Sequence, residues 1–405
     1  MECNRLKFFK LLFFVLLSLT LGACGPVKDF QTQLSEVIIG QDAIDPPTPL
    51  KDIKAIIQPK LLWKVSSKVD DRFDLSPVVS AEHVYAASSD GLLGKYNLMS
   101  GKSIWEIKTE QIISGGLGFG SDIIAFGTLN GYVFSYDING KLLWKSKVSS
   151  TVLSAPVIIE DTVLVRTMDN NIHAFGLKDG AKKWIFNRQG PALTLRSSAS
   201  LVSSDGVIYV GYPGGKLVAI RLDNGTLLWE SSVAQPKGIT EVERIVDITS
   251  QPVIDGMVIY AVAYNGRIAA VDRINGRVIW NRDISSFTGM NIEGGRIYLS
   301  HSGGAVYSLD NTSGKTFWRQ GDLLNRKLSK PLPMSEYIAV GDIAGVVHIL
   351  DRETGAFLGR IELEANAAST FLDENNPVMS NMIEYEPGKL LAQTRNGGLY
   401  AISIK

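Results

Sequence analysis

One phrase, Gly-x-x-x-Trp, recurs along the chain and constrains its fold more than any other feature. The chain contains seven tryptophans, and successive ones are 38 to 51 residues apart. They are Trp63, Trp105, Trp144, Trp184, Trp229, Trp280 and Trp318. A period near 40 residues in a chain of short apolar segments is typical of a β-propeller, in which each unit forms one four-stranded blade.

Each unit reads as four short strands. In the unit that ends at Trp280, the runs QPVID, MVIYAVAY, RIAAVDR and RVIWNR are separated by Asp-Gly or Asn-Gly pairs. Such pairs between apolar runs signal hairpins, because glycine adopts a positive φ without a Cβ clash. After Trp318 the phrase returns once more, with Gly355 in its usual place and Gly359 where a tryptophan would stand. We therefore predict an all-β fold, an eight-bladed propeller of four-stranded antiparallel blades.

The ends of the chain predict how this ring closes. The last unit supplies only three strands, whereas PKLLWKVSS at 59–67 matches the outer-strand phrase GKLLWKSKV at 140–148. The N-terminal strand should therefore complete the last blade beside the C-terminal strands, which leaves no terminal blade to cap. Each tryptophan is predicted to lie across the neighbouring blade and fill the wedge between two twisted sheets.

The N-terminus has the pattern of an export signal. Three basic residues precede the apolar run LLFFVLLSLTLGAC, which ends at Cys24. This run resembles the lipobox of bacterial lipoproteins, which implies cleavage before Cys24, acylation of that cysteine, and, with Gly25 in place of aspartate, sorting to the outer membrane. The alternative is an ordinary signal peptide with an incidental cysteine. We expect a signal peptide over 1–23, a lipidated cysteine and flexible tether over 24–60, and the propeller over 61–405.

Charge and cysteine content exclude several classes of function. Beyond residue 23 the chain carries 38 basic and 40 acidic residues, so it has no basic surplus to neutralise a nucleic acid backbone. Of its two cysteines, Cys3 lies in the signal, and only Cys24 remains after cleavage. An internal disulfide is therefore excluded, and Cys24 is best explained as an attachment point.

Signals for catalysis are weak. The four histidines lie in four different units, no pair has metal-ligand spacing, and no Gly-x-Ser-x-Gly elbow or Walker-type loop occurs. The units also resemble those of quinoprotein alcohol dehydrogenases, but those enzymes are much longer and use a quinone, calcium and an adjacent-cysteine disulfide. We predict a protein that is not an enzyme and that holds no cofactor or metal. The alternative is a ligand-binding or degenerate quinoprotein-type propeller that uses its central tunnel.

Two consecutive connections lengthen the period. They read NRQGPALTLRSS at 187–198 and AQPKGITEVERIVDITSQP at 234–252, and both lead from an outer strand to the next innermost strand. Such connections open on one face, so the two inserts should be neighbours in space. Apolar residues beside an arginine are typical of interface anchors, and a mixed charged set suits polar recognition. The candidates are Leu193, Leu195 and Arg196, and then Glu241, Glu243, Arg244 and Asp247. The alternatives are a leucine tucked under the ring and a solvated second loop.

The lipoprotein signal, the eight units and the phrases PALTLR and TEVERIVDITSQPV together resemble the BamB family. This resemblance covers essentially the whole chain after the signal. It implies a scaffold on the periplasmic face of the outer membrane, within the β-barrel assembly machine, that docks onto a POTRA domain of BamA. It also implies help in folding and inserting β-barrel proteins. A further hypothesis, which no particular residue supports, is that blade edges are offered to unfolded barrel strands by β-augmentation.

The resemblance also assigns contact residues. It implies that Leu193, Leu195 and Arg196 form a first contact patch and that Asp247 belongs to a second. The family pattern has another acid two residues after this aspartate, and here that position is Thr249. The electrostatic part of the contact is therefore expected to be weaker, or shared with Glu241 or Glu243. A structural lipoprotein with a different envelope partner is a further hypothesis.

Overall fold

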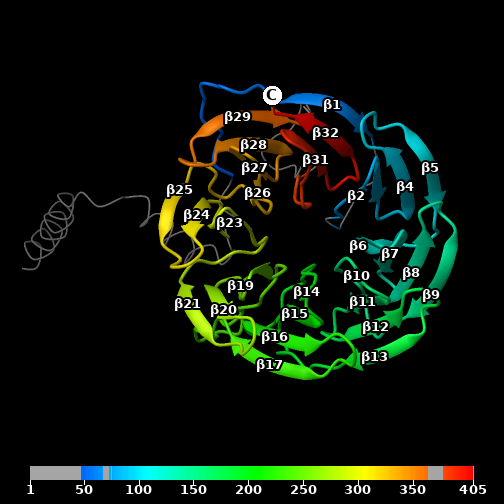
Figure 1. Ribbon diagram of the computed structural model, residues 1–405. Helices are drawn as coiled ribbons and strands as arrows, with labels where there is room; N and C mark the ends of the chain where they lie inside the picture. Colours follow the sequence, from blue (N-terminus) through cyan, green and yellow to red (C-terminus); the bar gives the residue numbers. More distant parts are fainter. Residues whose placement is uncertain (1–46, 67–72, 74, 364–376, 405) are drawn as a thin grey trace, which may run out of the picture. The chain divides into compact units, whose positions relative to one another are not determined.

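The computed structural model describes residues 47–66, 73, 75–363 and 377–404, which fold into a ring of eight four-stranded antiparallel sheets (Figure 1). This arrangement confirms the predicted eight-bladed propeller. Cys24 and the predicted signal peptide lie outside the described residues. The described ranges contain no helical residue, and hence no helix long and apolar enough to cross a membrane.

Within each blade the strands run outward from the centre of the ring in chain order. The first four blades consist of β2 (Val78–Ser80), β3 (His83–Ala87), β4 (Leu92–Asn97) and β5 (Ser103–Lys108); β6 (Ile113–Gly120), β7 (Ile123–Thr128), β8 (Tyr132–Asp137) and β9 (Leu142–Lys147); β10 (Val157–Ile159), β11 (Thr162–Arg166), β12 (Ile172–Gly176) and β13 (Lys182–Phe186); β14 (Val202–Ser204), β15 (Val207–Tyr212), β16 (Lys216–Arg221) and β17 (Leu227–Ser232).

The remaining blades repeat the pattern, except that the eighth takes its outer strand from the N-terminus. They consist of β18 (Val253–Asp255), β19 (Val258–Val262), β20 (Ile268–Asp272) and β21 (Val278–Arg282); β22 (Met290–Glu293), β23 (Arg296–Ser300), β24 (Val306–Asp310) and β25 (Thr316–Gln320); β26 (Leu332–Pro333), β27 (Tyr337–Gly341), β28 (Val346–Asp351) and β29 (Phe357–Glu362); β30 (Ile383–Glu386), β31 (Lys389–Gln393), β32 (Leu399–Ser403) and β1 (Lys60–Val65).

The ring closes as predicted. Strand β1 pairs antiparallel with β32, from Lys60 opposite Ser403 to Val65 opposite Leu399. The eighth blade is therefore built from both ends of the propeller, and no blade of the ring stands as an uncapped terminus.

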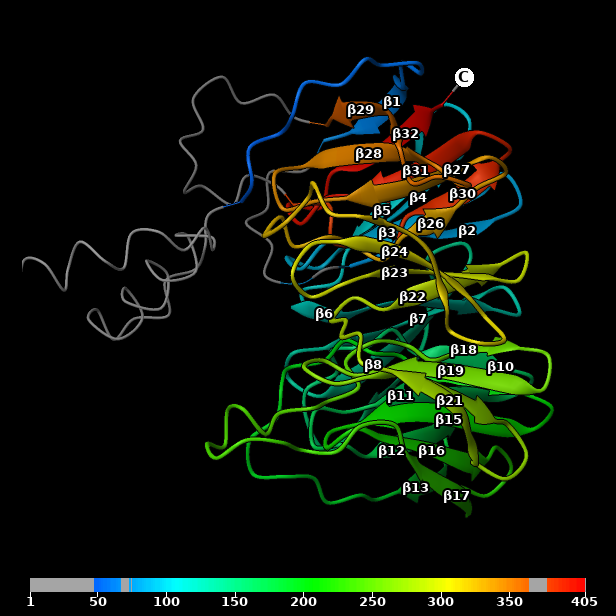
Figure 2. The ribbon, with the colours of Figure 1, turned by 90° about the vertical axis from the view of Figure 1, so that its left-hand side faces the viewer.

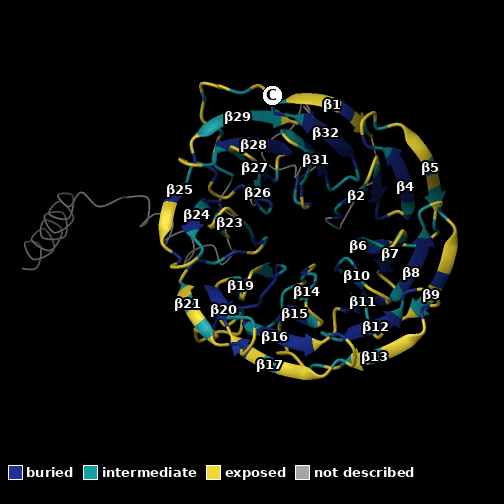
Figure 3. Cartoon of the chain, in the orientation of Figure 1, coloured by how far each residue is buried: buried dark blue, intermediate teal, exposed yellow. Residues whose placement is uncertain are grey.

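The hydrophobic core lies between neighbouring blades. Leu164 and Ile172 of the third blade, for example, pack with Ile208 and Val218 of the fourth, and all four side chains are fully buried. The middle strands of each blade are buried on both faces, whereas the outer strands are largely exposed (Figure 3). Because the apolar faces of the blades cover one another around the ring, each blade depends on both neighbours for its burial.

The Gly-x-x-x-Trp phrase forms the seams between blades. The indole Nε1 of Trp144 donates to the carbonyl oxygen of Leu177 in the next blade at 2.8 Å. Its ring covers Gly180, where φ is +67° and an added Cβ would lie 2.5 Å from ring atoms. The glycine of each phrase therefore leaves room for the tryptophan of the preceding blade. The other six indoles donate in the same way to the carbonyls of Leu98, Ile138, Leu222, Arg273, Asn311 and Arg352.

The seam without a tryptophan is covered by the N-terminal segment, residues 47–59. Gly359 of β29 lacks a side chain, and a Cβ there would lie 2.3 Å from the carbonyl oxygen of Ile57. The amides of Ile56 and Ile57 donate to the Leu358 carbonyl at 2.8 and 3.0 Å. The part of the predicted tether that the structure describes is thus packed along the propeller, and it replaces the missing indole.

Candidate partner-binding site

The two long connections lie side by side on one face of the propeller. We call them loop A, residues 187–201 between β13 and β14, and loop B, residues 233–252 between β17 and β18. The Ser197 hydroxyl donates to the Thr249 carbonyl at 3.1 Å, and the Gln251 amide donates to the Leu201 carbonyl at 2.9 Å. The two inserts are therefore neighbours, as the sequence predicted. Figure 2 shows the green tip of loop B projecting from the face where the blue N-terminal segment meets the ring.

Asp247 joins the two loops from within. Its side chain is only 3% exposed, and its carboxylate accepts hydrogen bonds from the backbone amides of Leu195 at 2.7 Å and Gly214 at 3.0 Å. A carboxylate that is buried and holds two backbone donors is not presented to a partner. The structure therefore places Asp247 beneath the surface as a support for loop A, whereas the resemblance had implied a direct contact.

Loop A presents one apolar and one cationic side chain. Leu193 is 44% exposed, and Arg196 is exposed without a hydrogen bond or ion pair to any described residue. Leu195 is partly buried and lines a small cavity beneath the loop together with Arg166. Of the three residues predicted in loop A, Leu193 and Arg196 thus face outward and Leu195 faces inward.

A buried arginine supports the loops from below. The Arg166 guanidinium donates to the Ala199 carbonyl at 3.2 Å and lies 5.1 Å from the centre of the Tyr212 ring. Burial lowers the pKa of Arg166, and the nearby Tyr212 and Asp247 act in the opposite direction. Burial also raises the pKa of Tyr212 to about 12. Because the carboxylate of Asp247 lies near this buried charge, it supports loop A both electrostatically and by hydrogen bonding.

The tip of loop B is held by a capping box. Glu243 accepts hydrogen bonds from the amides of Ile239 at 2.8 Å and Thr240 at 3.1 Å, and the Thr240 hydroxyl accepts one from the Glu243 amide at 3.2 Å. These reciprocal bonds order one turn of chain. Bonds from Thr240 and Ile239 also hold the pKa of Glu243 below its ordinary value. Glu243 therefore shapes the tip while its side chain stays exposed.

The shaped tip exposes two apolar side chains that the sequence analysis missed. Ile239 is 97% exposed and Val242 is 68% exposed. The phrase Thr-x-x-Glu at 240–243 is a capping-box signature, and it would have indicated that the residues around it are held outward. An isoleucine side chain that is fully exposed in an ordered turn would gain free energy if a partner covered it. The tip is therefore a candidate anchor.

The charges around these anchors are mostly positive. Arg196, Lys237 and Arg244 are exposed, and none of the three makes an ion pair with a described residue. Among the predicted acids, only Glu241 is both exposed and outside the capping box. We call a set of exposed side chains on these two neighbouring loops the loop surface: Leu193, Arg196, Lys237, Ile239, Glu241, Val242 and Arg244.

Thr249 does not lie on the loop surface. It is 4% exposed, and its hydroxyl donates to the Phe287 carbonyl of the neighbouring connection at 2.9 Å. The threonine that departs from the family pattern thus makes a buried contact between the connections that lead to blades five and six. It removes no charge from the exposed part of the loop surface.

A buried cluster of three titratable side chains outside the loops serves packing. The His348 Nε2 and the Arg326 Nε both donate to Asp342 Oδ2, at 2.9 and 2.6 Å, and all three side chains are buried. Burial lowers the pKa of His348. Burial alone would raise the pKa of Asp342, but the hydrogen bond from His348 and the charge of Arg326 hold it below its ordinary value. Arg326 also donates to the Thr48 carbonyl at 3.0 Å, so this cluster fixes the N-terminal segment.

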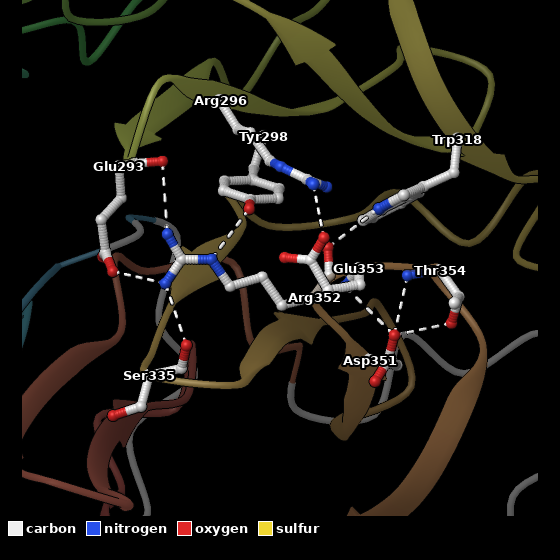
Figure 4. Close-up of polar contacts among 9 residues, drawn as sticks. All are labelled: Glu293, Arg296, Tyr298, Trp318, Ser335, Asp351, Arg352, Glu353 and Thr354. Atoms are coloured by element: carbon white, nitrogen blue, oxygen red, sulfur yellow. Dashed lines mark hydrogen bonds and ion pairs between the residues drawn. The ribbon is translucent and has the colours of Figure 1, made fainter.

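A second charged cluster lies on the opposite face, at the seam of blades six and seven (Figure 4). Arg352 donates to Glu293 Oε1 at 2.6 Å and to the Tyr298 hydroxyl at 3.0 Å, and Arg296 pairs with Glu353. These contacts tie one blade to the next. Over the described ranges, no three His, Cys, Asp or Glu side chains are arranged to hold a metal ion.

Sequence comparison identifies the family. A family profile described as "Outer membrane protein assembly factor BamB" matches residues 89–320 and 302–405. The chain belongs to the BamB family. It is 38% identical over 306 residues to the BamB of Bordetella pertussis, which covers 75% of this chain and 79% of that protein. It is 32% identical over 361 residues to the BamB of Burkholderia pseudomallei, which covers 89% and 92%. Both relatives are named outer membrane protein assembly factors.

Structural comparison supports the same fold. The crystal structure of BamB from Moraxella catarrhalis has a TM-score of 0.77 at 24% identity, covering 85% of this chain and all of that one. A quinohemoprotein alcohol dehydrogenase from Comamonas testosteroni has a TM-score of 0.69 at 13% identity, covering 85% and 76%. The propeller is thus shared between BamB proteins and dehydrogenases, and the fold alone does not separate the two functions.

Proposed function

We propose that this protein is a non-enzymatic scaffold of the outer membrane protein assembly complex and that its loop surface binds a periplasmic POTRA domain of BamA. By holding that domain it assists the folding and insertion of β-barrel proteins. The names of its relatives support the assembly role. The observation that carries the contact is that two neighbouring loops expose apolar and cationic side chains, Leu193 and Arg196 on loop A and Ile239, Val242 and Arg244 on loop B. Apolar anchors with arginine are enriched in the centres of protein interfaces.

The proposal includes a lipid anchor at Cys24 on the periplasmic face of the outer membrane. Its support is the lipobox-like sequence before Cys24 and the outer membrane in the relatives' names. Metabolic labelling with a palmitate analogue tests it. We expect label in the wild-type protein and none in Cys24→Ser, and label retained in Cys24→Ser would refute the anchor.

The contact is tested by calorimetric titration of the purified protein against the periplasmic POTRA domains of the cognate BamA. We expect Arg196→Glu and Ile239→Ser each to weaken binding by about tenfold or more, because each removes a central group of the interface. The matched control is Ile274→Ser, since Ile274 is 70% exposed in the turn between β20 and β21, on the opposite face. This variant should bind like the wild type.

The possible outcomes test separately whether BamA is the partner and whether the loop surface is the binding site. If neither substitution changes the affinity, BamA remains the partner but the loop surface is not where it binds. An absence of binding by the wild-type protein would overturn the BamA contact and favour a different envelope partner.

We also propose that the outer strands offer their edges to unfolded barrel strands. Leu142 and Leu143 in β9 and Leu227 and Leu228 in β17 are exposed on such strands. An exposed edge with apolar side chains can add a further strand by β-augmentation. Photo-crosslinking from position 228 to an unfolded barrel protein is expected, and its absence would remove this second role.

A further inference from the structure

We propose that the central channel of the propeller binds a small organic anion, a carboxylate with an apolar body, whose charged group pairs with Lys330. This site is independent of the loop surface. The channel is a cavity of about 430 Å3 lined by the innermost strands and connections of all eight blades. A cavity of that size accommodates a small molecule.

The electrostatics of the channel point to an anion. Lys330 is the one ionisable side chain among the described residues that line it, and it makes no hydrogen bond or ion pair with a described residue. Partial burial lowers the pKa of Lys330. A cation removed from water without a partner is costly, and an anion that pairs with it recovers part of that free energy.

Three hydroxyls of the channel are already engaged. The hydroxyls of Thr249, Thr288 and Ser200 donate to the backbone carbonyls of Phe287, Leu328 and Ala155 at 2.9 to 3.0 Å. Their hydrogens therefore point into the wall. Among the described residues that line the channel, Lys330 offers the one charged donor to a bound molecule, and the Ser250 hydroxyl, which has no hydrogen-bond partner, offers a neutral one.

The rest of the lining defines the class of anion. Leu117, Phe119, Phe287 and Met379 contribute apolar surface to the same cavity. One ammonium balances a single negative charge, whereas a phosphate dianion would leave an uncompensated charge in a partly apolar channel. A monocarboxylate with an aromatic or aliphatic body satisfies both features.

Binding is tested with benzoate, by saturation-transfer NMR and calorimetry on the full-length protein. We expect a dissociation constant of about 1 mM or tighter for the wild type and a loss of about tenfold or more in Lys330→Met. Lys330→Arg, which keeps the charge, should retain binding. Lys141→Met, a matched lysine exposed in the turn between β8 and β9, should be unchanged.

Two further probes separate charge from apolar contact. Benzyl alcohol, which has the body without the charge, and inorganic phosphate, which has the charge without the body, should both bind more weakly than benzoate. In 13C-dimethylated protein, benzoate should also shift the Lys330 methyl signal, identified by its absence in Lys330→Arg. This readout does not depend on the folding of Lys330→Met. Equal benzoate binding by Lys330→Met, no binding by the wild type, or phosphate binding as tight as benzoate would each overturn the proposal.

Discussion

The Oδ2 atom of Asp247 lies 2.7 Å from the backbone nitrogen of Leu195, 52 residues earlier in the chain, and this hydrogen bond holds loop A against loop B. The other carboxylate oxygen accepts the Gly214 amide at 3.0 Å. Because an amide side chain can replace only one of these acceptors, Asp247→Asn should lower the free energy of unfolding by about 1–3 kcal/mol. Urea denaturation followed by tryptophan fluorescence measures this loss.

The exposed acid of loop B provides the control for that measurement. Glu241 makes no ion pair with a described residue, so Glu241→Gln should change stability by about 0.5 kcal/mol or less. If Asp247→Asn proves as stable as Glu241→Gln, the hydrogen bonds of Asp247 do not support the site.

A pair of glycines tests the seam. Gly180 and Gly206 have φ of +67° and +73°, so alanine at either position costs about 1–2 kcal/mol in backbone strain. An added Cβ meets the Trp144 ring at Gly180 and meets nothing within 4 Å at Gly206. Gly180→Ala should therefore lose about 1–3 kcal/mol more than Gly206→Ala, because only it overpacks the seam. Equal losses of unfolding free energy in the two variants, measured by urea denaturation, would show that the Trp144 indole can move aside without destabilising the seam.

The seventh blade tests whether the N-terminal segment stands in for the missing indole. Gly359→Ala would bring a Cβ to 2.3 Å from the Ile57 carbonyl oxygen, and should displace residues 47–59 from β29. We expect lower stability and faster proteolysis within this segment. In a variant that lacks residues 47–58 the same substitution should be close to neutral, giving a coupling of about 1 kcal/mol or more. Additive effects would mean that the segment and Gly359 act independently.

Acid should weaken the fold through His348. Its Nε2 bonds Asp342, whereas its buried Nδ1 has no hydrogen-bond partner among the described residues, so a second proton would be left unsatisfied. Burial accordingly lowers the pKa of His348 below its ordinary value. As pH falls below about 6.5, His348 binds a proton in the unfolded chain but not in the folded protein. The free energy of unfolding therefore decreases.

Substitution isolates that contribution. His348→Gln should be less stable than the wild type near neutral pH but should lose less stability between about pH 7.5 and 5.5, because one titrating group is gone. Chemical denaturation at both pH values provides the comparison. An equal loss in both proteins would assign the acid sensitivity to other groups, such as His173, whose pKa burial also lowers.

The fold was predictable because its determinants are periodic. Repeated Gly-x-x-x-Trp phrases specify both partners of each seam, the glycine that is covered and the indole that covers it. Closure was predictable because PKLLWKVSS repeats an outer-strand phrase. The contacts of the N-terminal segment were not predictable, since they join residues such as Lys51 and Asp322 that are 271 positions apart, and no repeat records them.

The candidate site was predictable in position but less so in detail. Breaks in the period placed both loops correctly, and Leu193 and Arg196 face outward as expected. Side-chain direction within a loop follows no period, so nothing in the sequence showed that Asp247 points inward. The prediction of Glu243 rested on its charge alone and did not consider its spacing from Thr240. The capping box it forms is what exposes Ile239.

The pairing of β1 with β32 also governs the timing of folding. In chain order β1 is the first described strand and β32 is the last, so the opposition of Lys60 and Ser403 cannot form until the chain through β32 is available to fold. Contacts this distant in sequence slow folding and prolong the exposure of strand edges. A chain that stops before β32 leaves β1 without its partner. Every incomplete product therefore carries the same open edge, which gives quality-control proteases a common feature to recognise.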